Sequence, residues 1–137
     1  KLRIVGHVCE KLKEHADDPS ILLNGYVPSL AEVYEKAQIV VNPTYIGSGL
    51  KIKSVEALAH GKPLATWGNG LTGMGQDVPC LMSGHWQGIA QDVIELLSNA
   101  ELRERLSSRA VDYIRERYTK ECIYRPLREV IERGSAL

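Results

Sequence analysis

The residues best suited to chemistry lie in one run, YIGSGLKIKSVEALAHGKPLA, at residues 45–65. Gly47, Ser48 and Gly49 would let the backbone come close to a bound group. They stand directly before a predicted helix, whose first amides belong to Gly49, Leu50 and Lys51. The N-terminus of a helix favours an anion, and phosphate above all. This order of residues predicts a junction that holds phosphate.

Charged side chains in the same run would extend that site. Lys51 and Lys53 add positive charge beside the glycines. Glu56 lies about one and a half turns inside the helix, where a carboxylate can accept hydrogen bonds from ribose hydroxyls beyond a phosphate. Spacing alone fits equally well with a glycine-rich turn followed by solvated lysines and an exposed glutamate. Both interpretations stay open at this point.

Other glycine patterns fit known phosphate loops less well. Gly61-Lys62 lacks the spacing that precedes the lysine of a P-loop. The run GNGLTG, residues 68–73, matches Gly-x-Gly-x-x-Gly after a strand, but the MGQDVPC that follows cannot open a helix. We therefore expect a mobile loop at the same end of the sheet, not a dinucleotide site.

Histidines and tryptophans give weaker signals. His60, one turn beyond Glu56, is expected to complement the dipole at a helix C-terminus. His7 follows a predicted strand end, a rim position from which it could face a ligand. Trp67 and Trp86 are expected to pack in the core or in loops. No carboxylate pair suits acid–base catalysis and no carboxylate–histidine cluster has metal-ligand spacing, so neither a catalytic residue nor a metal site is predicted.

Composition limits the classes of partner. The chain has 137 residues with 44% apolar content, enough for one core, so a single domain is expected. Lysine plus arginine equal aspartate plus glutamate at 17 each, which disfavours nucleic acid as a partner. Cys9, Cys80 and Cys122 are far apart, and we expect reduced, buried thiols in a cytoplasmic protein.

Apolar runs alternate with helical patterns over the first 83 residues, whereas the remaining residues carry helical patterns alone. This alternation predicts an α/β fold, a Rossmann-like three-layer sandwich with a parallel sheet and a helical C-terminal segment. Strands are expected at 2–5, 21–24, 38–43, 62–66 and within 78–82, and helices at 7–15, from Ser29, at 51–60 with Gly61 as C-cap, at 89–99, at 100–118, and after Thr119 with an interruption at Pro126.

The run GYVPSLAEVYEKAQIVVNPTYIGSGLKIKSVEALAHGKPLAT, residues 25–66, resembles the nucleotide-sugar-binding half of GT-B glycosyltransferases of the family 4 type. The order of strand, loop, capped helix, strand, glycine turn and EALAHGKP helix matches this family along most of the chain. The resemblance implies one half of a GT-B fold.

The resemblance also implies roles for individual residues. Glu56 matches the second glutamate of the family's Glu-x7-Glu motif, which binds the ribose. The first glutamate of that motif falls at Ser48, whose short, uncharged side chain leaves the donor sugar open. The remaining assignments are a diphosphate cradle at Gly47, Ser48, Gly49, Leu50 and Lys51, and a nucleobase border at Gly25, Tyr26 and Val27.

The function implied is sugar transfer from a nucleoside diphosphate to an acceptor, such as a glycan, a lipid or another cell-surface precursor. No cofactor and no metal are expected, because the nucleotide sugar is a substrate. The alternative is a non-catalytic GT-B-like nucleotide-binding or scaffold domain, which the serine at position 48 favours. Donor base, sugar, acceptor and stereochemical outcome stay open.

The chain opens with KLRIVG, which already has the character of a core strand. We therefore expect residues 1–137 to be a single donor-binding domain whose N-terminal acceptor domain is missing, and to be inactive alone. The expected partners are a nucleoside-diphosphate sugar and that missing domain. Peripheral membrane association of the full-length enzyme is compatible with this interpretation.

Overall fold

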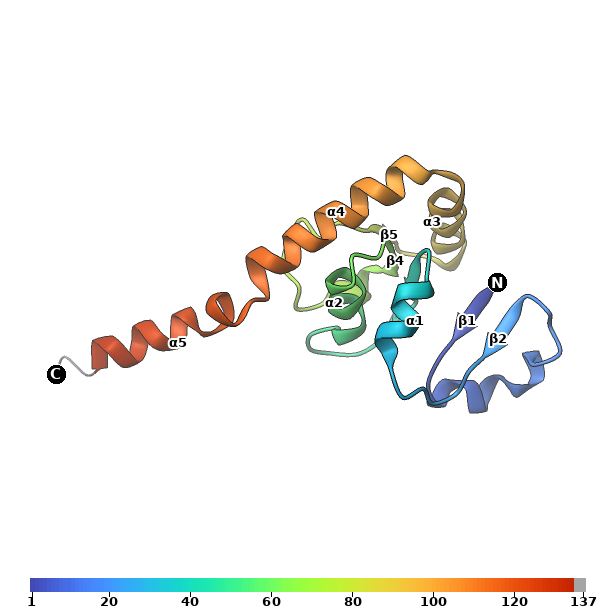
Figure 1. Cartoon of the computed structure of the whole chain (residues 1–137), viewed down its shortest axis with the longest axis horizontal. Helices are drawn as coiled ribbons and strands as arrows, with labels where there is room; N and C mark the ends of the chain where they lie inside the picture. Colours follow the sequence, from blue (N-terminus) through green and yellow to red (C-terminus); the bar gives the residue numbers. More distant parts are fainter. Residues whose placement is uncertain (135–137) are drawn as a thin grey trace. The chain divides into compact units, whose positions relative to one another are not determined.

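A computed structural model describes residues 1–134, which divide into two compact units, Lys1–Val33 and the residues from Tyr34 onward. Figure 1 shows the elements of both units in chain order. The first unit contains a parallel strand pair with a 3-10 helix between the strands. Its elements are β1 (Leu2–Ile4), η1 (His7–His15) and β2 (Ile21–Leu23).

The turn after β2 is fastened to the end of β1. The Gly6 amide donates to the Gly25 carbonyl oxygen at 2.6 Å, and the Gly25 amide donates to the Cys9 sulfur at 3.4 Å. Gly25 has a φ of 59°, a left-handed value that favours glycine. The predicted nucleobase border therefore begins at a turn with a defined backbone.

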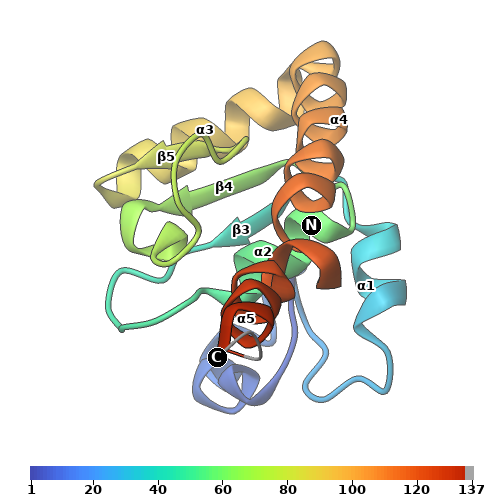
Figure 2. The same cartoon turned by 90° about the vertical axis from the view of Figure 1, so that its left-hand side faces the viewer.

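The second unit is built on a parallel sheet in the order β3–β4–β5, which Figure 2 shows side by side. All described strand pairs are parallel, as predicted, but the strands belong to two sheets, one in each unit. Alternating apolar runs and helices predict parallel pairing without indicating which strands are neighbours. The three strands are β3 (Val40–Asn42), β4 (Leu64–Trp67) and β5 (Leu81–Ser83).

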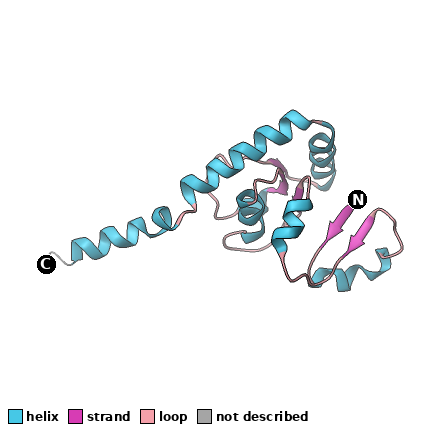
Figure 3. Ribbon diagram, in the orientation of Figure 1, coloured by secondary structure: helices cyan, strands magenta, loops and turns pink. Residues whose placement is uncertain are grey.

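Beyond β5 the described chain is helical, as Figure 3 shows and the sequence predicts. Asn99 caps α4 by accepting from the Leu102 amide at 2.9 Å, and Thr119 accepts from the Cys122 amide at 3.3 Å. The expected interruption at Pro126 was wrong, because the last helix continues through it. The helices are α1 (Leu30–Lys36), α2 (Ile52–Ala59), α3 (Trp86–Ser98), α4 (Ala100–Arg117) and α5 (Lys120–Gly134).

Helices cover both faces of the β3–β4–β5 sheet. On one face, Leu64 packs with Ala57 and Leu58 of α2. On the other face, Ala65 packs with Leu96 of α3 and with residues of α4. Consecutive strand residues point to opposite faces, so these two clusters form the two inner boundaries of a three-layer sandwich.

The cysteines are free thiols, as expected. Cys9 is buried, but Cys80 and Cys122 are only partly so, which corrects the expectation that all three are buried. Burial, with a smaller contribution from Asp92, raises the pKa of the Cys80 thiol to about 11, which makes it a poor nucleophile. None of the helices in residues 1–134 combines the length and apolar character needed to cross a bilayer.

Candidate functional site

The candidate site lies where β3 and β4 end and α2 begins. The loop after Asn42 contains Gly47 with a φ of 123° and Gly49 with a φ of 74°. Side chains with a Cβ rarely adopt such values, so this loop requires glycine at both positions. Because these glycines carry no Cβ, the backbone here can come close to a ligand.

Lys51 forms hydrogen bonds both within this loop and to the neighbouring segment at Thr72. It stands at the N-cap position of α2, which begins at Ile52, one residue after the predicted start. Its Nζ donates to the Ser48 carbonyl oxygen at 3.3 Å, and its backbone amide donates to the Thr72 carbonyl oxygen at 3.3 Å. The amide assigned to phosphate is therefore occupied, and any contribution of Lys51 to a phosphate has to come from its ammonium group.

A buried polar network holds the start of α2 on the strand ends. Asn42 Nδ2 donates to Ser54 Oγ at 2.8 Å, and Ser54 Oγ donates to the Gly70 carbonyl oxygen at 2.7 Å. Thr66 Oγ1 donates to the Asn42 carbonyl oxygen at 2.9 Å. Ser54 and Thr66 are fully buried and Asn42 nearly so. Buried polar groups with satisfied hydrogen bonds rigidify their surroundings, so this network fixes the helix N-terminus relative to the sheet.

The residue pattern of the sequence does not reveal this network. Its members are isolated polar residues, at the last position of β3, the third position of α2 and the third position of β4. A buried polar side chain costs free energy unless a hydrogen-bond partner satisfies it. That cost is the signal by which these residues could have been found in the sequence. Asn42 has a further partner in Thr44, whose Oγ1 donates to Asn42 Oδ1 at 2.6 Å.

The GNGLTG run is part of the same edge. We expected a mobile loop, but Gly68–Leu71 forms a 3-10 helix, and Thr72 closes it by donating to the Asn69 carbonyl oxygen at 2.9 Å. A Cβ on Gly73 would lie 3.0 Å from Leu50 Cα. This segment therefore packs directly against the glycine loop and supports it from outside.

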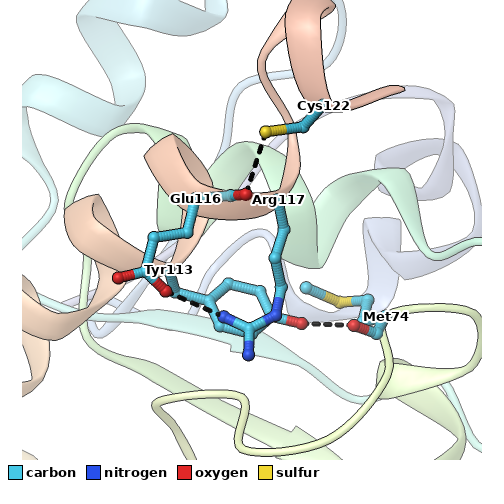
Figure 4. A network of polar contacts seen from close by, with 5 residues as sticks. All are labelled: Met74, Tyr113, Glu116, Arg117 and Cys122. Atoms are coloured by element: carbon cyan, nitrogen blue, oxygen red, sulfur yellow. Dashed lines mark hydrogen bonds and ion pairs between the residues drawn. The ribbon is translucent and has the colours of Figure 1, made fainter. Parts of the chain in front are cut away.

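Figure 4 shows how α4 supports that segment in turn. The Tyr113 hydroxyl donates to the Met74 carbonyl oxygen, and the Arg117 guanidinium lies 4.5 Å from the centre of the Tyr113 ring. Tyr113 is buried. The support of the glycine loop thus extends from α2 through residues 68–74 to α4.

Glu56, the predicted ribose ligand, is a partly buried residue in the second turn of α2. Its Oε2 accepts from the Tyr34 hydroxyl at 3.4 Å. The Tyr34 ring stacks on the His60 ring with centroids 4.6 Å apart, so His60 packs against Tyr34. Tyr34 is a positioning residue for Glu56 that the sequence did not reveal.

Burial is the main cause that raises the pKa of Tyr34 to about 12, and the Glu56 carboxylate adds to it. The Tyr34 phenol therefore stays protonated and can donate at neutral pH. One oxygen of the Glu56 carboxylate has this fixed donor, which orients the group. The ribose role of Glu56 stays a prediction.

The remaining predicted residues belong to the first unit. Tyr26 is 80% exposed, beside Gly25 and Val27. His7 is exposed, and its Nδ1 lies 3.7 Å from a carboxylate oxygen of Glu10. The roles of these residues at a nucleobase or a rim stay predictions.

The described residues 1–134 contain no group of three or more histidine, cysteine, aspartate or glutamate side chains arranged to hold a metal ion. What the loop offers is glycine backbone and basic side chains. These groups suit an anion, whereas a divalent cation prefers carboxylate oxygens. That binding needs no metal stays a prediction.

Comparison with known proteins identifies the fold and the family. The chain superposes on TarM, a GT-B glycosyltransferase, with a TM-score of 0.77 and 18% identity, over 93% of this chain and 28% of TarM. An S. aureus TarM mutant in complex with fondaparinux, alpha-GlcNAc-glycerol and UDP gives a TM-score of 0.72 and 21% identity, over 91% of this chain and 27% of that chain.

The chain thus has the α/β fold of part of a GT-B enzyme, as predicted, and spans just over a quarter of the length of these structures. No curated protein sequence matches it significantly. The family model for glycosyl transferases group 1 matches residues 1–99, well over half of the chain. The chain belongs to this glycosyltransferase family.

Proposed function

We propose that this chain is the donor-binding domain of a glycosyltransferase that moves a sugar from a nucleoside diphosphate to an acceptor. The observation that carries the proposal is one loop–helix unit. It presents two glycines with positive φ, a lysine at the helix N-terminus and a partly buried carboxylate in the second turn. Phosphate, then ribose, is the ligand that matches this order of groups.

The chemistry proposed for the site is stabilisation of the leaving diphosphate. Negative charge develops on that group as the bond to the sugar breaks, and donors fixed in advance lower the barrier. Lys51 supplies the charge, and the glycine loop supplies backbone amides around residues 47–50. The network of Asn42, Ser54 and Thr66 keeps these donors in place, so that little reorganisation is needed during reaction.

Calorimetric titration with UDP, GDP and ADP and with their sugars tests the proposal. UDP is the first choice because the TarM mutant complex contains it. We expect at least one diphosphate to bind, and to bind equally well in the presence of EDTA. Loss of binding on chelation would show that a metal, and not the amides and Lys51, holds the diphosphate.

Glu56→Gln gives a sharper test. A charge-assisted hydrogen bond contributes about 1.5 to 3 kcal/mol, so the variant should bind the diphosphate roughly ten- to a hundredfold more weakly. A 2′,3′-dideoxy diphosphate lacks the hydroxyls and should bind both proteins alike. The double-mutant cycle isolates the contact. Equal losses of affinity for both ligands would show that Glu56 has only a structural role, as the partner of Tyr34.

Transfer itself should require more than this chain, because an acceptor must be positioned and water excluded. We propose that the acceptor domain lies outside residues 1–137, and we expect no sugar transfer by these residues alone. The competing function, a non-catalytic nucleotide-binding or scaffold domain, is favoured by Ser48 in place of a glutamate. Transfer activity of the full-length protein, lowered by Glu56→Gln to the same extent as donor binding, separates the two.

A further inference from the structure

The loop proposed to hold phosphate has few fixed contacts of its own. In the described residues 1–134, the backbone amides of residues 47–50 donate to no protein group. The Ser48 carbonyl oxygen accepts from the flexible side chain of Lys51. Free amides suit an anion, yet donors stabilise it best when they are fixed before it arrives. The contacts that fix these amides must therefore come from outside the loop.

Residues 72–74 form the wall against which the loop packs. The Thr72 carbonyl oxygen accepts from the Lys51 amide at 3.3 Å. A Cβ on Gly73, whose φ is 81°, would lie 3.0 Å from Leu50 Cα and 3.2 Å from the Leu50 backbone nitrogen. The two backbones are thus in direct contact, so a shift of residues 72–74 would move the Leu50 and Lys51 amides as well.

Met74 anchors this wall to the interior of the second unit. Its side chain is 3% exposed and belongs to the apolar core that contains Leu58 and Leu64. Its carbonyl oxygen accepts from the hydroxyl of Tyr113, a buried residue of α4, as Figure 4 shows. Among the described residues, no other group donates to that carbonyl oxygen. Because a buried carbonyl needs a donor, Tyr113 holds this segment in one position relative to α4.

Two features keep the Tyr113 hydroxyl in place as a donor. The guanidinium carbon of Arg117, one turn further along α4, lies 4.5 Å from the centre of the Tyr113 ring, a cation–π contact. Burial is the main cause that raises the pKa of Tyr113 to about 12, so the phenol stays protonated at neutral pH. The Met74 carbonyl oxygen therefore has a permanent donor.

We propose that Tyr113 is a positioning residue for the phosphate-binding backbone. Its hydroxyl fixes residues 72–74, and these residues fix the amides of Leu50 and Lys51. Tyr113 is only 4% exposed, too deeply buried to touch a ligand, so it contributes to diphosphate affinity indirectly. The inference rests on the proposed function and adds to it a residue from a helix that forms no part of the loop.

Ser107 provides a matched control on the same helix. Its hydroxyl also donates to a backbone carbonyl oxygen, that of Gly61, but at the opposite end of the strands. Tyr113→Phe and Ser107→Ala therefore each remove one bond between an α4 hydroxyl and a backbone carbonyl. If both bonds only stabilise the fold, neither variant should change the phosphate-binding loop.

Amide shifts of the unliganded proteins give the first measurement, because they need no ligand. In two-dimensional NMR spectra, Tyr113→Phe should move the amide signals of Gly49, Leu50 and Lys51, and Ser107→Ala should leave them unchanged. Gly73→Ala presses directly on Leu50 and should move the same signals, which keeps the test decisive if Tyr113→Phe does not fold. Unchanged signals in either Tyr113→Phe or Gly73→Ala would overturn the inference.

Ligand affinity gives the second measurement. UDP, GDP and ADP are each titrated, beside the corresponding nucleoside, into the folded variants. Tyr113→Phe should weaken a diphosphate that binds by about fivefold, as expected for one hydrogen bond, and leave its nucleoside almost unaffected. Ser107→Ala should weaken neither.

Equal losses of affinity for the diphosphate and its nucleoside would reduce Tyr113 to a structural residue and overturn the inference while the proposed function stands. If the amide signals move as expected but no diphosphate binds, Tyr113 still positions the loop and it is the proposed function that fails.

Discussion

Basic side chains lie at both ends of the β3–β4–β5 strands, which we call the amino edge and the carboxyl edge of the sheet. The two groups of side chains differ in the partners they bind. At the amino edge, Lys62 Nζ donates to the Glu35 carbonyl oxygen at 3.2 Å, near the end of α1. Arg103 Nη1 donates to the Leu96 and Leu97 carbonyl oxygens at 2.7 and 3.0 Å, at the end of α3. These cations complete helix C-termini. A depression of about 520 Å³ lies there, lined by Ala37, Gln38, Gly61, Lys62, Pro63, Arg103, Glu104, Ser107 and Ser108.

At the carboxyl edge, Lys51 Nζ donates to the Ser48 carbonyl oxygen of its own loop, and the Lys51 amide donates to the Thr72 carbonyl oxygen in the segment packed against that loop. Beneath that loop lie three buried polar side chains, and within it lie two glycines with positive φ. We therefore place the proposed site at the carboxyl edge, where the backbone can approach a ligand and is held by a buried network, and not in the depression at the amino edge.

The largest effect is expected at Gly70, beneath the carboxyl edge. A Cβ there would lie 2.1 Å from Thr66 Oγ1, which would displace the hydroxyl from the Asn42 carbonyl oxygen. Gly70→Ala should lower the free energy of unfolding by about 3 kcal/mol in denaturant titrations. Gly84→Ala, whose Cβ meets nothing within 4 Å, should change it by less than about 0.5 kcal/mol. Similar unfolding free energies for the two variants would show that the network can rearrange to accept the added methyl group.

Two serine substitutions compare the edges directly. Ser54→Ala leaves Asn42 and the Gly70 carbonyl unsatisfied in the core and should cost about 2 kcal/mol of unfolding free energy. Ser107→Ala removes a partly buried bond to the Gly61 carbonyl oxygen and should cost about 1 kcal/mol. UDP affinity, measured where both variants are folded, should fall only for Ser54→Ala. A loss with Ser107→Ala would contradict the assignment of the site to the carboxyl edge.

The sequence predicted the helices and strands better than the side-chain contacts that hold them together. Repeating apolar patterns locate the strands and helices. The C-cap of α2 is His60, one residue before the predicted Gly61, which follows it with a φ of 62°. The buried network escaped prediction because single residues such as Asn42 and Thr66 have no periodic signal. Their roles arise from contacts between segments that are 12 and 24 residues apart. The Tyr34–Glu56 bond is of the same kind, across 22 residues.

Lysine substitutions should change UDP affinity by a smaller amount, in a direction set by the charge that is removed. Lys51→Met should weaken UDP by about tenfold, because one charge-assisted hydrogen bond to phosphate is lost. Lys62→Met removes the same charge at the amino edge and should leave UDP affinity unchanged. The difference between the variants should shrink as salt is added. Equal losses would indicate only a general attraction of the domain for anions.

The smallest effect concerns the pH dependence of stability. Tyr34 has a pKa raised to about 12 from 10.0, chiefly by burial. Its stabilising contribution is therefore complete below pH 10 and is lost as the pH rises toward 12. Tyr34→Phe should show a shallower fall in unfolding free energy over this interval than the unmodified chain. The unfolding free energies come from denaturant titrations at each pH. The same dependence on pH in both proteins would show that the surroundings do not raise the pKa of the Tyr34 phenol.

Binding of a nucleoside diphosphate at the carboxyl edge of the sheet can be followed residue by residue by NMR. UDP is titrated into the isotope-labelled chain while backbone amide shifts are followed at both edges of one sheet. We expect the largest changes at Gly47, Gly49 and Leu50, with the amide shifts of Gly61, Lys62 and Ser107 unchanged. Saturable changes confined to Gly61, Lys62 and Ser107, or none at either edge for any nucleoside diphosphate, would contradict binding at the carboxyl edge.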